Sequence, residues 1–432
     1  MEGYLKKGTE LKADSGNRYT IIRLLGAGGQ GEVYEVECGS SRYALKWYYK
    51  NRATIEQKEK IKAIIASESP DPMFLWPQEM IEEGEFFGYI MDLRPEHFCN
   101  IADLMKGRVD VSFYHLCVTA YQLSKGYKLL HDKGAVYYDI SFGNLFFDPN
   151  TGNVLICDND NITFDAKQRA GVLGTPGFMA PEIVRLEARP SRNTDLYSLS
   201  VMLFYLLMVN HPLEGKKESD IVCMDMEARK KLYGTEPVFI FDPENTSNRP
   251  VKGIHDNAMI YWELYPAELR EMFLHAFTKG LQEPAARVTE LEWMHIFSDM
   301  MHKLMPCKAC GADIFYDEEK EKQGQVHQCW SCGKEVAIPY KLCIGEHMTF
   351  LRRGMTISSD QIYGDHDVQK VVGKVVENPK NPRILGIQNL DHTNWIYEKA
   401  DGSKVLLLPK KTARVTREMK LHFPNGCVLE VL

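Results

Sequence analysis

The chain has 432 residues, of which 44% are hydrophobic and 26% are charged, and its formal net charge is −7. Because this chain is longer than a domain built around one hydrophobic core usually is, we expect two or three domains. The weakly acidic balance creates no overall field that would favour nucleic acid or an anionic membrane as a partner.

The sequence carries no signal for export or membrane insertion. Its first residues contain no apolar segment typical of a secretion signal. The longest apolar run, residues 196–209, is short for a membrane span and predicts a buried helix. Without a secretion signal, the eleven cysteines favour reduced thiols or metal ligands over disulfides. We therefore expect a cytoplasmic location.

The first hundred residues read mainly as strands. Three segments between residues 17 and 50 alternate in polarity and are rich in β-branched and aromatic residues, which predicts three antiparallel strands. Isoleucines within 54–66 lie near helical spacing and are followed by Pro70 and Pro72, so a helix is expected there. Further strands are expected around 85–93.

After Pro95 the pattern changes to longer helices, and near residue 337 it changes again to short β-type runs separated by turns. The expected elements before that second change are a helix at 112–131, strands at 145–147 and 154–157, a helix at 195–209, a long polar connection at 214–260 and helices within 265–305.

A glycine-rich segment, Gly-Ala-Gly-Gly-Gln-Gly-Glu-Val, lies between the first two expected strands. Gly26, Gly28 and Gly31 would let backbone N–H groups approach phosphate oxygens, because no Cβ stands in the way. Val33 would then cover an adenine ring. A plain β-hairpin is the alternative interpretation.

Lys46 ends the third strand in an Ala-Leu-Lys context. A lysine there can bridge ATP phosphates and pair with a carboxylate of the following helix. Glu59 is the expected partner, with Glu56 and Glu68 as alternatives. A solvated lysine at a strand end is the competing interpretation.

Three polar residues follow with the spacing that phosphoryl transfer needs. Asp139 would accept or orient the proton of a substrate hydroxyl, and the Asn144 amide oxygen would bind Mg²⁺. Asp158 would bridge the metal ions to phosphates, since Mg²⁺ prefers one or two carboxylates. Asp160 is interpreted as a turn residue, with a second metal carboxylate as the alternative.

The segment Gly-Thr-Pro-Gly-Phe-Met-Ala-Pro-Glu, residues 174–182, completes this series. With it, the chain resembles eukaryotic-type serine/threonine protein kinases over about residues 18–300. The resemblance implies an α+β, bilobal protein kinase fold, ATP with Mg²⁺ or Mn²⁺ as cofactors, and protein hydroxyls as acceptors.

The same resemblance implies further roles. Asp195 would begin the buried helix that anchors the catalytic loop, Arg287 would pair with Glu182, and Thr163 would be a site of autophosphorylation. Thr175 would hydrogen-bond near Asp139. The ATP-binding set comprises Gly26, Gly28, Gly31, Val33, Ala44, Lys46, the gatekeeper Met91 and the hinge residues Asp92 and Arg94.

Several positions depart from the kinase pattern. Tyr137-Tyr138-Asp139 replaces His-Arg-Asp, Ser141 replaces a lysine that contacts the γ-phosphate, and Asp158-Asn159-Asp160 replaces Asp-Phe-Gly. Without the arginine, activation should not depend on an activation-loop phosphate. An active serine/threonine kinase is the prediction, and an ATP-binding pseudokinase scaffold is the alternative. A small-molecule kinase of the aminoglycoside or choline type is opposed by the 174–182 segment.

Residues 232–243, together with Asp-Asn-Asp, resemble bacterial kinases of tellurite-resistance and stress systems. That resemblance implies a PP2C-type phosphatase and a von Willebrand A protein as partners.

Two Cys-x-x-Cys-Gly pairs then follow, separated by eighteen residues. Four sulfurs at this spacing predict a structural, tetrahedral Zn²⁺ site, with a redox pair as the alternative. The ligands are Cys307, Cys310, Cys329 and Cys332, and His327 is interpreted as a neighbour only. The balanced charge of this ribbon favours a structural or protein-contact role over nucleic-acid binding.

The remaining residues predict a small all-β sandwich that weakly resembles a forkhead-associated domain. Such domains read phosphothreonine with an Arg, a Ser and an Asn, and the residues of these types are Arg352, Arg353, Ser358, Ser359 and Asn389. Protein contact by a degenerate sandwich is favoured over phosphopeptide reading. The predicted domains are a kinase domain at 1–302 (N-lobe about 18–94, C-lobe 95–302), a zinc ribbon at 303–336 and the β domain at 337–432.

Overall fold

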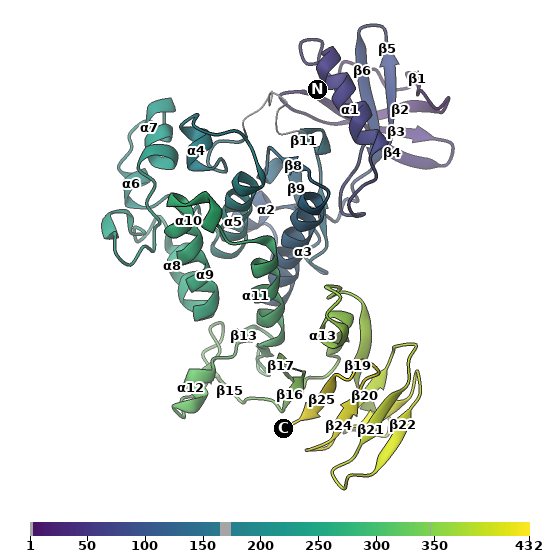
Figure 1. Cartoon of the computed structure of the whole chain (residues 1–432), viewed down its shortest axis with the longest axis vertical. Coiled ribbons are helices and arrows are strands. Elements are labelled where there is room, and N and C mark those ends of the chain that lie inside the picture. The colour runs from purple at the N-terminus through teal and green to yellow at the C-terminus, as the bar shows by residue number, and fades with distance from the viewer. Residues whose placement is uncertain (1–2, 165–173, 346) are drawn as a thin grey trace. The chain divides into compact units, whose positions relative to one another are not determined.

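A computed structural model describes residues 3–164, 174–345 and 347–432 (Figure 1). These residues form two compact units. The first unit contains Met1–Val111, Val118–Glu263 and Ala267–Met294, and the second contains Ser112–Cys117, Leu264–Pro266 and His295–Leu432.

The N-lobe of the first unit is a six-stranded sheet in which neighbouring strands are antiparallel. Its strands, in spatial order, are β1 (Glu10–Lys12), β2 (Arg18–Ala27), β3 (Gly31–Cys38), β4 (Ser41–Tyr48), β6 (Phe86–Asp92) and β5 (Glu79–Glu83). The three strands predicted between residues 17 and 50 and a strand predicted around 85–93 are confirmed, whereas β1 and β5 were not predicted. Alternating side chains such as Ile21, Val36 and Leu45 are buried in one cluster on the sheet.

Helix α1 (Ile55–Ala66) follows the third predicted strand, as expected. The Thr54 hydroxyl accepts a hydrogen bond from the Gln57 N–H and so caps the first turn. Ile61 and Ile64 are buried, and these two positions set the face that α1 presents to the lobe.

The C-lobe is mainly helical. Its elements are β7 (Cys99–Asn100), α2 (Ile101–Met105), α3 (Phe113–Asp132), β8 (Val136–Tyr137), η1 (Phe142–Asn144), β9 (Leu145–Phe147), β10 (Val154–Ile156), η2 (Asn159–Asn161), β11 (Ile162–Thr163), α4 (Pro181–Val184), α5 (Arg192–Met208), α6 (Lys216–Ser219), α7 (Met226–Lys230), η3 (Lys231–Thr235), η4 (Thr246–Asn248), α8 (Asp256–Leu264), α9 (Ala267–Phe277), α10 (Lys279–Gln282), η5 (Pro284–Ala286) and α11 (Glu290–His302).

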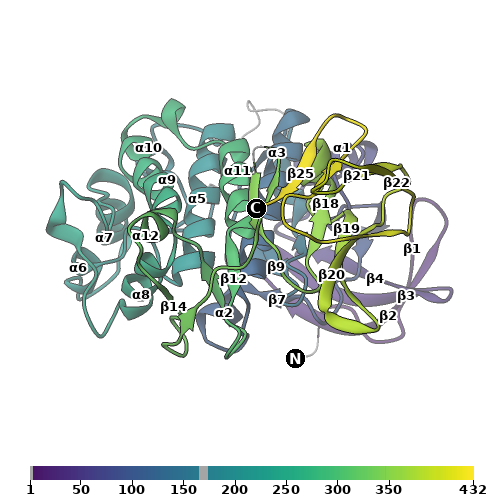
Figure 2. The same cartoon turned by 90° about the horizontal axis from the view of Figure 1, so that it is seen from below.

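Helix α5 is the centre of the C-lobe core. It lies beside α9 (Figure 2), and nearly every side chain from Thr194 to Met208 is buried, as predicted for the longest apolar run. Ser191 and Thr194 form a capping box at its start. Within the described part of the chain, no helix combines the length and the apolar character needed to cross a bilayer.

The expected long polar connection at 214–260 is wrong. The segment contains α6, α7, a π-helical turn and η4, and it buries Leu232, Phe239 and Ile240. Phe239 packs its ring against Phe204 of α5. Pro237, Pro243 and Pro250 interrupt the segment, so the sequence pattern indicated a loop and did not reveal the burial of these apolar residues.

In the second unit, a small ribbon precedes the β domain. The ribbon comprises β12 (Leu304–Pro306), β13 (Asp313–Phe315), α12 (Glu318–Lys322), β14 (His327–Gln328) and β15 (Glu335–Val336). Its two hairpins pair β12 with β13 and β14 with β15.

The C-terminal strands form two antiparallel sheets, as expected of an all-β region. One sheet has the order β17 (His347–Phe350), β16 (Lys341–Ile344), β25 (Val428–Val431), β24 (Lys420–His422), β21 (Trp395–Glu398) and β22 (Lys404–Leu407). The other has the order β18 (Thr356–Ser358), β19 (Val371–Asn378), β20 (Asn381–Asn389) and β23 (Thr412–Arg414), with α13 (Ser359–Tyr363) after β18. Buried residues from both sheets, including Ile387 and Trp395, form one core.

Candidate active site and cysteine cluster

The glycine-rich segment forms the turn between β2 and β3. The Gly28 N–H donates to the Gly31 carbonyl at 2.9 Å. A Cβ on Gly31 would lie 2.1 Å from the Trp47 carbonyl oxygen, so close approach of β4 requires glycine there. A Cβ on Gly26 or Gly28 would meet no described atom within 4 Å. The loop therefore has open space over these two glycines, which fits a phosphate-binding role.

Lys46 lies on β4, and its side chain is only 4% exposed. The Lys46 Nζ lies 2.9 Å from both carboxylate oxygens of Asp160 and 3.3 Å from Oδ1 of Asp158. It also donates to the Gln30 Oε1 of the glycine loop at 3.1 Å. The interpretation of Lys46 as a solvated lysine is therefore wrong.

The predicted pairing of Lys46 with a glutamate of α1 is also wrong. The Glu59 side chain is 66% exposed and lies 3.8 Å from the Lys62 ammonium, and Glu56 and Glu68 are exposed as well. The buried face of α1 contains Ile61 and Ile64, and Glu59 lies outside it because successive residues turn by about 100°.

Asp160 occupies the place expected for that glutamate. Its side chain is fully buried, and it accepts hydrogen bonds from the hydroxyls of Tyr48 and Tyr89 as well as from Lys46. Although burial raises the pKa of Asp160, the Lys46 charge and the Tyr48 hydrogen bond hold it below its ordinary value. Asp160 does lie in a turn, η2, as predicted, but its carboxylate is the buried partner of Lys46.

Sequence reasoning missed this role, yet a signal was present. Tyr48 follows Lys46 by two residues on β4, so both side chains project from the same face of the strand. A lysine and a tyrosine hydroxyl buried on one face require an acceptor, because buried polar groups are almost always paired.

The other predicted catalytic residues come together on the C-lobe side. Thr175 donates to Oδ1 of Asp139 at 2.6 Å, which is the hydrogen bond expected from the sequence. The Asn144 amide nitrogen donates to the Asp139 carbonyl at 2.8 Å and to its Oδ2 at 3.3 Å. Thr175 and Asn144 therefore fix the Asp139 carboxylate from two sides.

Asp158 has left-handed backbone geometry, with φ of 52°. Such a conformation is strained for a non-glycine residue and is typical of functional positions. Burial raises the pKa of Asp158, although the Lys46 charge opposes the shift, and the Asp139 charge raises it further. Because the Asn144 amide N–H groups are directed to Asp139, its oxygen remains an acceptor. The Asn144 amide oxygen and the Asp158 carboxylate are the kinds of oxygen ligand that Mg²⁺ prefers.

The residues predicted around adenine lie on neighbouring strands. Met91 on β6 is buried and faces Ala44 of β4 in register, and Val33 faces Lys46. The Arg94 side chain stacks over the Phe146 ring, with 4.2 Å between the guanidinium carbon and the ring centroid.

The side chains of Asp92 and Arg94 already have protein partners. Asp92 accepts a hydrogen bond from Gln78 at 2.7 Å, and Arg94 donates to the Phe98 carbonyl at 2.6 Å. Any contact of these two residues with adenine would therefore come from their backbone.

The expected ion pair at the end of the activation segment is present. Both terminal nitrogens of Arg287 lie 2.8 Å from the Glu182 carboxylate. Thr163, in contrast, is 3% exposed and pairs with Val136 in β11. Its expected autophosphorylation is therefore not supported, because the hydroxyl is inaccessible. Residues 165–173 of the segment lie outside the described residues.

A buried charge network anchors the loop that carries Asp139; the sequence indicated the role of Asp195 but not its partners His131 and Glu290. Asp195 accepts from the Tyr137 N–H at 2.7 Å and lies 3.0 Å from Nε2 of His131. The other ring nitrogen of His131 pairs with Glu290, which also binds Arg192 at 2.6 Å. Although burial alone would lower it, hydrogen bonds to Asp195 and Glu290 raise the pKa of His131 to about 9.

We predict that the free energy of unfolding falls as the pH rises from 6.5 to about 9. The pKa of His131 is raised from 6.5 to about 9 on folding, so its stabilisation is complete below 6.5 and is lost as the pH passes the folded value. The full loss is about 3 kcal/mol. Urea unfolding at several pH values across this range measures the change in the free energy of unfolding. The slope should disappear in His131→Gln and persist in His97→Gln, an exposed histidine; equal slopes in both variants would contradict the assignment.

The four predicted cysteines form a cluster in the ribbon. Their sulfurs all lie within 4.8 Å of one another, with 3.7 Å between Cys307 and Cys332 and 3.5 Å between Cys310 and Cys329. A tetrahedral zinc with Zn–S bonds of about 2.3 Å places its sulfurs about 3.8 Å apart. The cluster therefore fits a tetrahedral metal ion.

The backbone of each Cys-x-x-Cys pair supports this fit. Gly311 and Gly333 have φ of 80° and 70°, and their N–H groups donate to the carbonyls of Cys307 and Cys329. Hydrogen bonds from the N–H groups of Ala309 and Cys310 lower the pKa of the Cys307 thiol, which favours the thiolate that binds metal. His327 instead accepts a hydrogen bond from the Asp317 N–H.

The residues named for phosphothreonine reading have structural partners. The Ser358 side chain caps α13, and Ser359 donates to Asp365 at 2.6 Å. Asn389 is fully buried and donates to the carbonyls of Thr393 and Leu407. These contacts do not support a phosphothreonine site built from them.

A sheet that carries Lys46, joined to a helical lobe that presents Asp139 and Asp158, defines a protein kinase domain. In agreement, residues 19–261, more than half of the chain, match the family model described as "Protein kinase domain". The chain belongs to this family.

Three similar proteins illustrate the relationship. The chain is 27% identical over 206 residues to "Probable serine/threonine-protein kinase CCRP1" of Zea mays, covering 46% of this chain and 32% of that protein. It is 27% identical over 217 residues to "Beta-adrenergic receptor kinase 1" of Homo sapiens (47% and 30%) and 29% identical over 220 residues to "Protein kinase C delta type" of Rattus norvegicus (47% and 31%). The chain thus spans about a third of the length of these curated relatives.

Proposed function

We propose that this protein is an ATP-dependent serine/threonine protein kinase that transfers the γ-phosphoryl group of ATP to protein hydroxyls. The observation that carries the proposal is the hydrogen-bonded arrangement of Asp139, Asn144 and Thr175 beside Asp158, with Lys46 held next to Asp158. Family membership and the serine/threonine kinases among the relatives support the same activity.

Each residue then has a defined task. Asp139 orients the acceptor hydroxyl and takes its proton, and Thr175 and Asn144 hold its carboxylate in position. Lys46 orients the phosphates, and Asp158 with Asn144 would hold Mg²⁺ or Mn²⁺. When bound, the metal neutralises charge on the phosphates.

The departures from the kinase pattern favour a slow enzyme without activation-loop control. Ser141 gives no positive charge near the γ-phosphate, and loss of one such contact costs about 1–3 kcal/mol of transition-state stabilisation. Tyr138 cannot bind an activation-loop phosphate as an arginine would. The buried network around His131 and Asp195 supports a catalytic loop that is held in place without it.

The other regions would serve assembly. We propose that the four cysteines bind a structural Zn²⁺ and that the β domain makes protein contacts. A PP2C-type phosphatase and a von Willebrand A protein are the partners that the resemblance to bacterial stress kinases implies.

The decisive experiment measures phosphate incorporation by the full chain with Mg-ATP and a generic protein acceptor. We expect Asp139→Asn to lower the rate by about 10²–10⁴-fold, because it removes the group that accepts or orients the hydroxyl proton. Radiolabel transfer from γ-labelled ATP gives the rate.

Asp132→Asn is the matched control. Asp132 lies on α3 with 55% of its side chain exposed, so the same chemical change there should leave the rate within about twofold. If the unchanged protein and Asp139→Asn incorporate phosphate equally, the kinase proposal is wrong, and ATP binding without transfer would favour a scaffold.

A further inference from the structure

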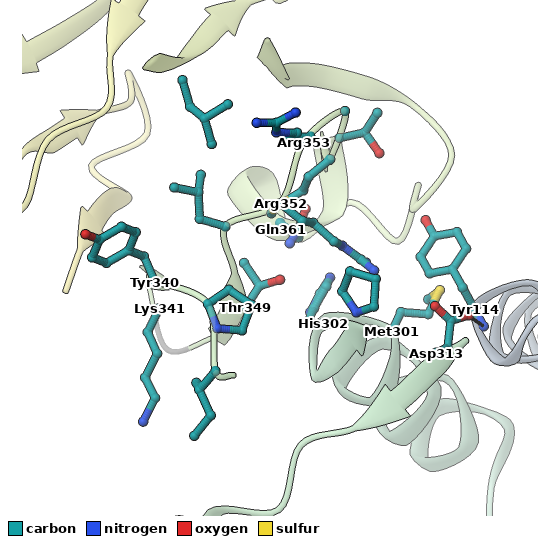
Figure 3. Close-up of a pocket in the computed structure, with 18 of the residues that line it drawn as sticks. Tyr114, Met301, His302, Asp313, Tyr340, Lys341, Thr349, Arg352, Arg353 and Gln361 are labelled. Atoms are coloured by element: carbon teal, nitrogen blue, oxygen red, sulfur yellow. Dashed lines mark hydrogen bonds between the residues drawn. The ribbon is translucent and has the colours of Figure 1, made fainter. Parts of the chain in front are cut away.

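The second unit contains a cavity of about 1470 Å³ that the proposed phosphoryl transfer does not use (Figure 3). Its wall is formed by the ribbon, the segment before β16, the loops after β17 and β23, and the start of α3. Small-molecule pockets usually measure about 300–1,000 Å³. A cavity of this size therefore suits a peptide segment better than a single small molecule.

The lining carries an excess of positive charge within an acidic protein. The lining contains five cationic side chains but only two carboxylates. The cations are Lys308, Lys341, Arg352, Arg353 and Arg417, and the carboxylates are Asp313 and Glu321.

Glu321 is neutralised by a lysine, whereas Asp313 is hydrogen-bonded but keeps its charge. Asp313 accepts from the Tyr114 N–H at 3.1 Å, and Glu321 lies 2.5 Å from the Lys341 ammonium. Arg353 is paired as well, with 2.9 Å to Glu377. The positive charge available to a ligand thus comes mainly from Lys308, Arg352 and Arg417.

Arg352 and Arg417 are held by aromatic rings instead of carboxylates. The Arg352 guanidinium carbon lies 5.8 Å from the Tyr114 ring centroid, and that of Arg417 lies 5.2 Å from the Tyr340 ring centroid. Among the described residues, neither forms an ion pair. A guanidinium that lies over a ring uses no N–H donor in that contact, so its N–H groups stay free to bind a carboxylate.

The two arginines lie apart. Figure 3 shows Tyr114 and Tyr340 on opposite sides of the cavity, and each carries its own arginine. Two separated guanidiniums match two separated carboxylates along a chain better than one compact phosphate, which needs donors that converge on a point. Met301, Leu351 and Met355 supply apolar wall between them.

We propose that this cavity binds an acidic peptide segment of a partner protein, in which Asp or Glu residues alternate with apolar ones. Arg352 and Arg417 bind carboxylates, and the apolar wall receives the side chains between them. The site is independent of the proposed kinase activity, because none of its residues lies among those assigned to phosphoryl transfer.

A random dodecapeptide phage library, panned on the full chain, tests this proposal. We expect the selected peptides to be rich in Asp and Glu interspersed with apolar residues. A selected peptide, labelled with fluorescein, should bind Arg352→Glu and Arg417→Glu about 10- to 100-fold more weakly in an anisotropy titration.

Arg414→Glu is the matched control, because Arg414 is exposed on β23 and does not line the cavity. The affinity of Arg414→Glu for the selected peptide should equal that of the unchanged chain. Equal zinc content and an equal melting temperature should show that all variants are folded. Selection without acidic enrichment, equal binding by Arg352→Glu, or preference for phosphoserine peptides or single-stranded RNA over acidic peptides would each overturn the proposal.

Discussion

Asp160→Asn is expected to lower the free energy of unfolding by about 1.5–3 kcal/mol and to weaken ATP binding by at least about tenfold. The substitution removes the nearest carboxylate of a lysine that is 4% exposed. Of its two carboxylate partners, the Lys46 ammonium would retain Asp158, at 3.3 Å, together with the neutral Gln30 oxygen. Denaturant unfolding and titration with a fluorescent ATP analogue measure the two effects.

The size of this effect follows from how completely the pair is buried. Burying a charge costs several kcal/mol, which is recovered only when the opposite charge and further hydrogen bonds are present. Asp160 supplies the charge, and Tyr48 and Tyr89 satisfy its oxygens. Asparagine keeps the shape of Asp160 but removes its charge, so the buried ammonium is left with Asp158 as its carboxylate partner, at the longer distance of 3.3 Å.

Glu59→Gln is the matched control, because it makes the same chemical change at the partner that the sequence predicted. The Glu59 side chain is 66% exposed, so we expect stability to change by less than about 0.5 kcal/mol and ATP affinity to be unchanged. A loss of ATP binding in Glu59→Gln, with Asp160→Asn intact, would mean that α1 provides the partner of Lys46 in solution.

The contrast between these two carboxylates shows what the sequence could predict. Strands at 17–50 alternate in polarity and were found by their period, and Asp139, Asn144 and Asp158 were found by their spacing. The phase of α1 does not follow from its period, because its four isoleucines indicate a broad apolar face. In the structure Ile55 is 82% exposed, and only Ile61 and Ile64 are buried.

Interactions between distant segments were not accessible from local patterns. Lys46 and Asp160 are separated by 114 positions, and His131 and Glu290 by 159. Pairs so far apart in the sequence produce neither a hydrophobic period nor a short motif that would reveal them. The cysteine cluster was found despite its spread, because metal ligands in short pairs carry their own spacing signal.

That cluster gives the second large expected effect. We predict that the purified full chain contains one zinc per molecule and that Cys329→Ser removes it and unfolds the ribbon. Structural zinc contributes about 10–16 kcal/mol of apparent binding free energy. The four cysteines have little other packing around them, because that core consists of Ile314, Val336, Cys307 and Cys329, with Ala312 against them, whereas Met305 and Tyr316 of the ribbon pack against Phe350.

Elemental analysis measures the metal, and limited proteolysis measures the ribbon. Cleavage between residues 307 and 332 should appear in Cys329→Ser and in the unchanged chain treated with a strong zinc chelator. Cys223→Ser is the control, because Cys223 is exposed and lies outside the cluster, so its zinc content and cleavage pattern should match the unchanged chain. A metal-free chain with a protease-resistant ribbon would refute the zinc site, because two short hairpins with so small a core cannot offset the entropy of ordering them alone.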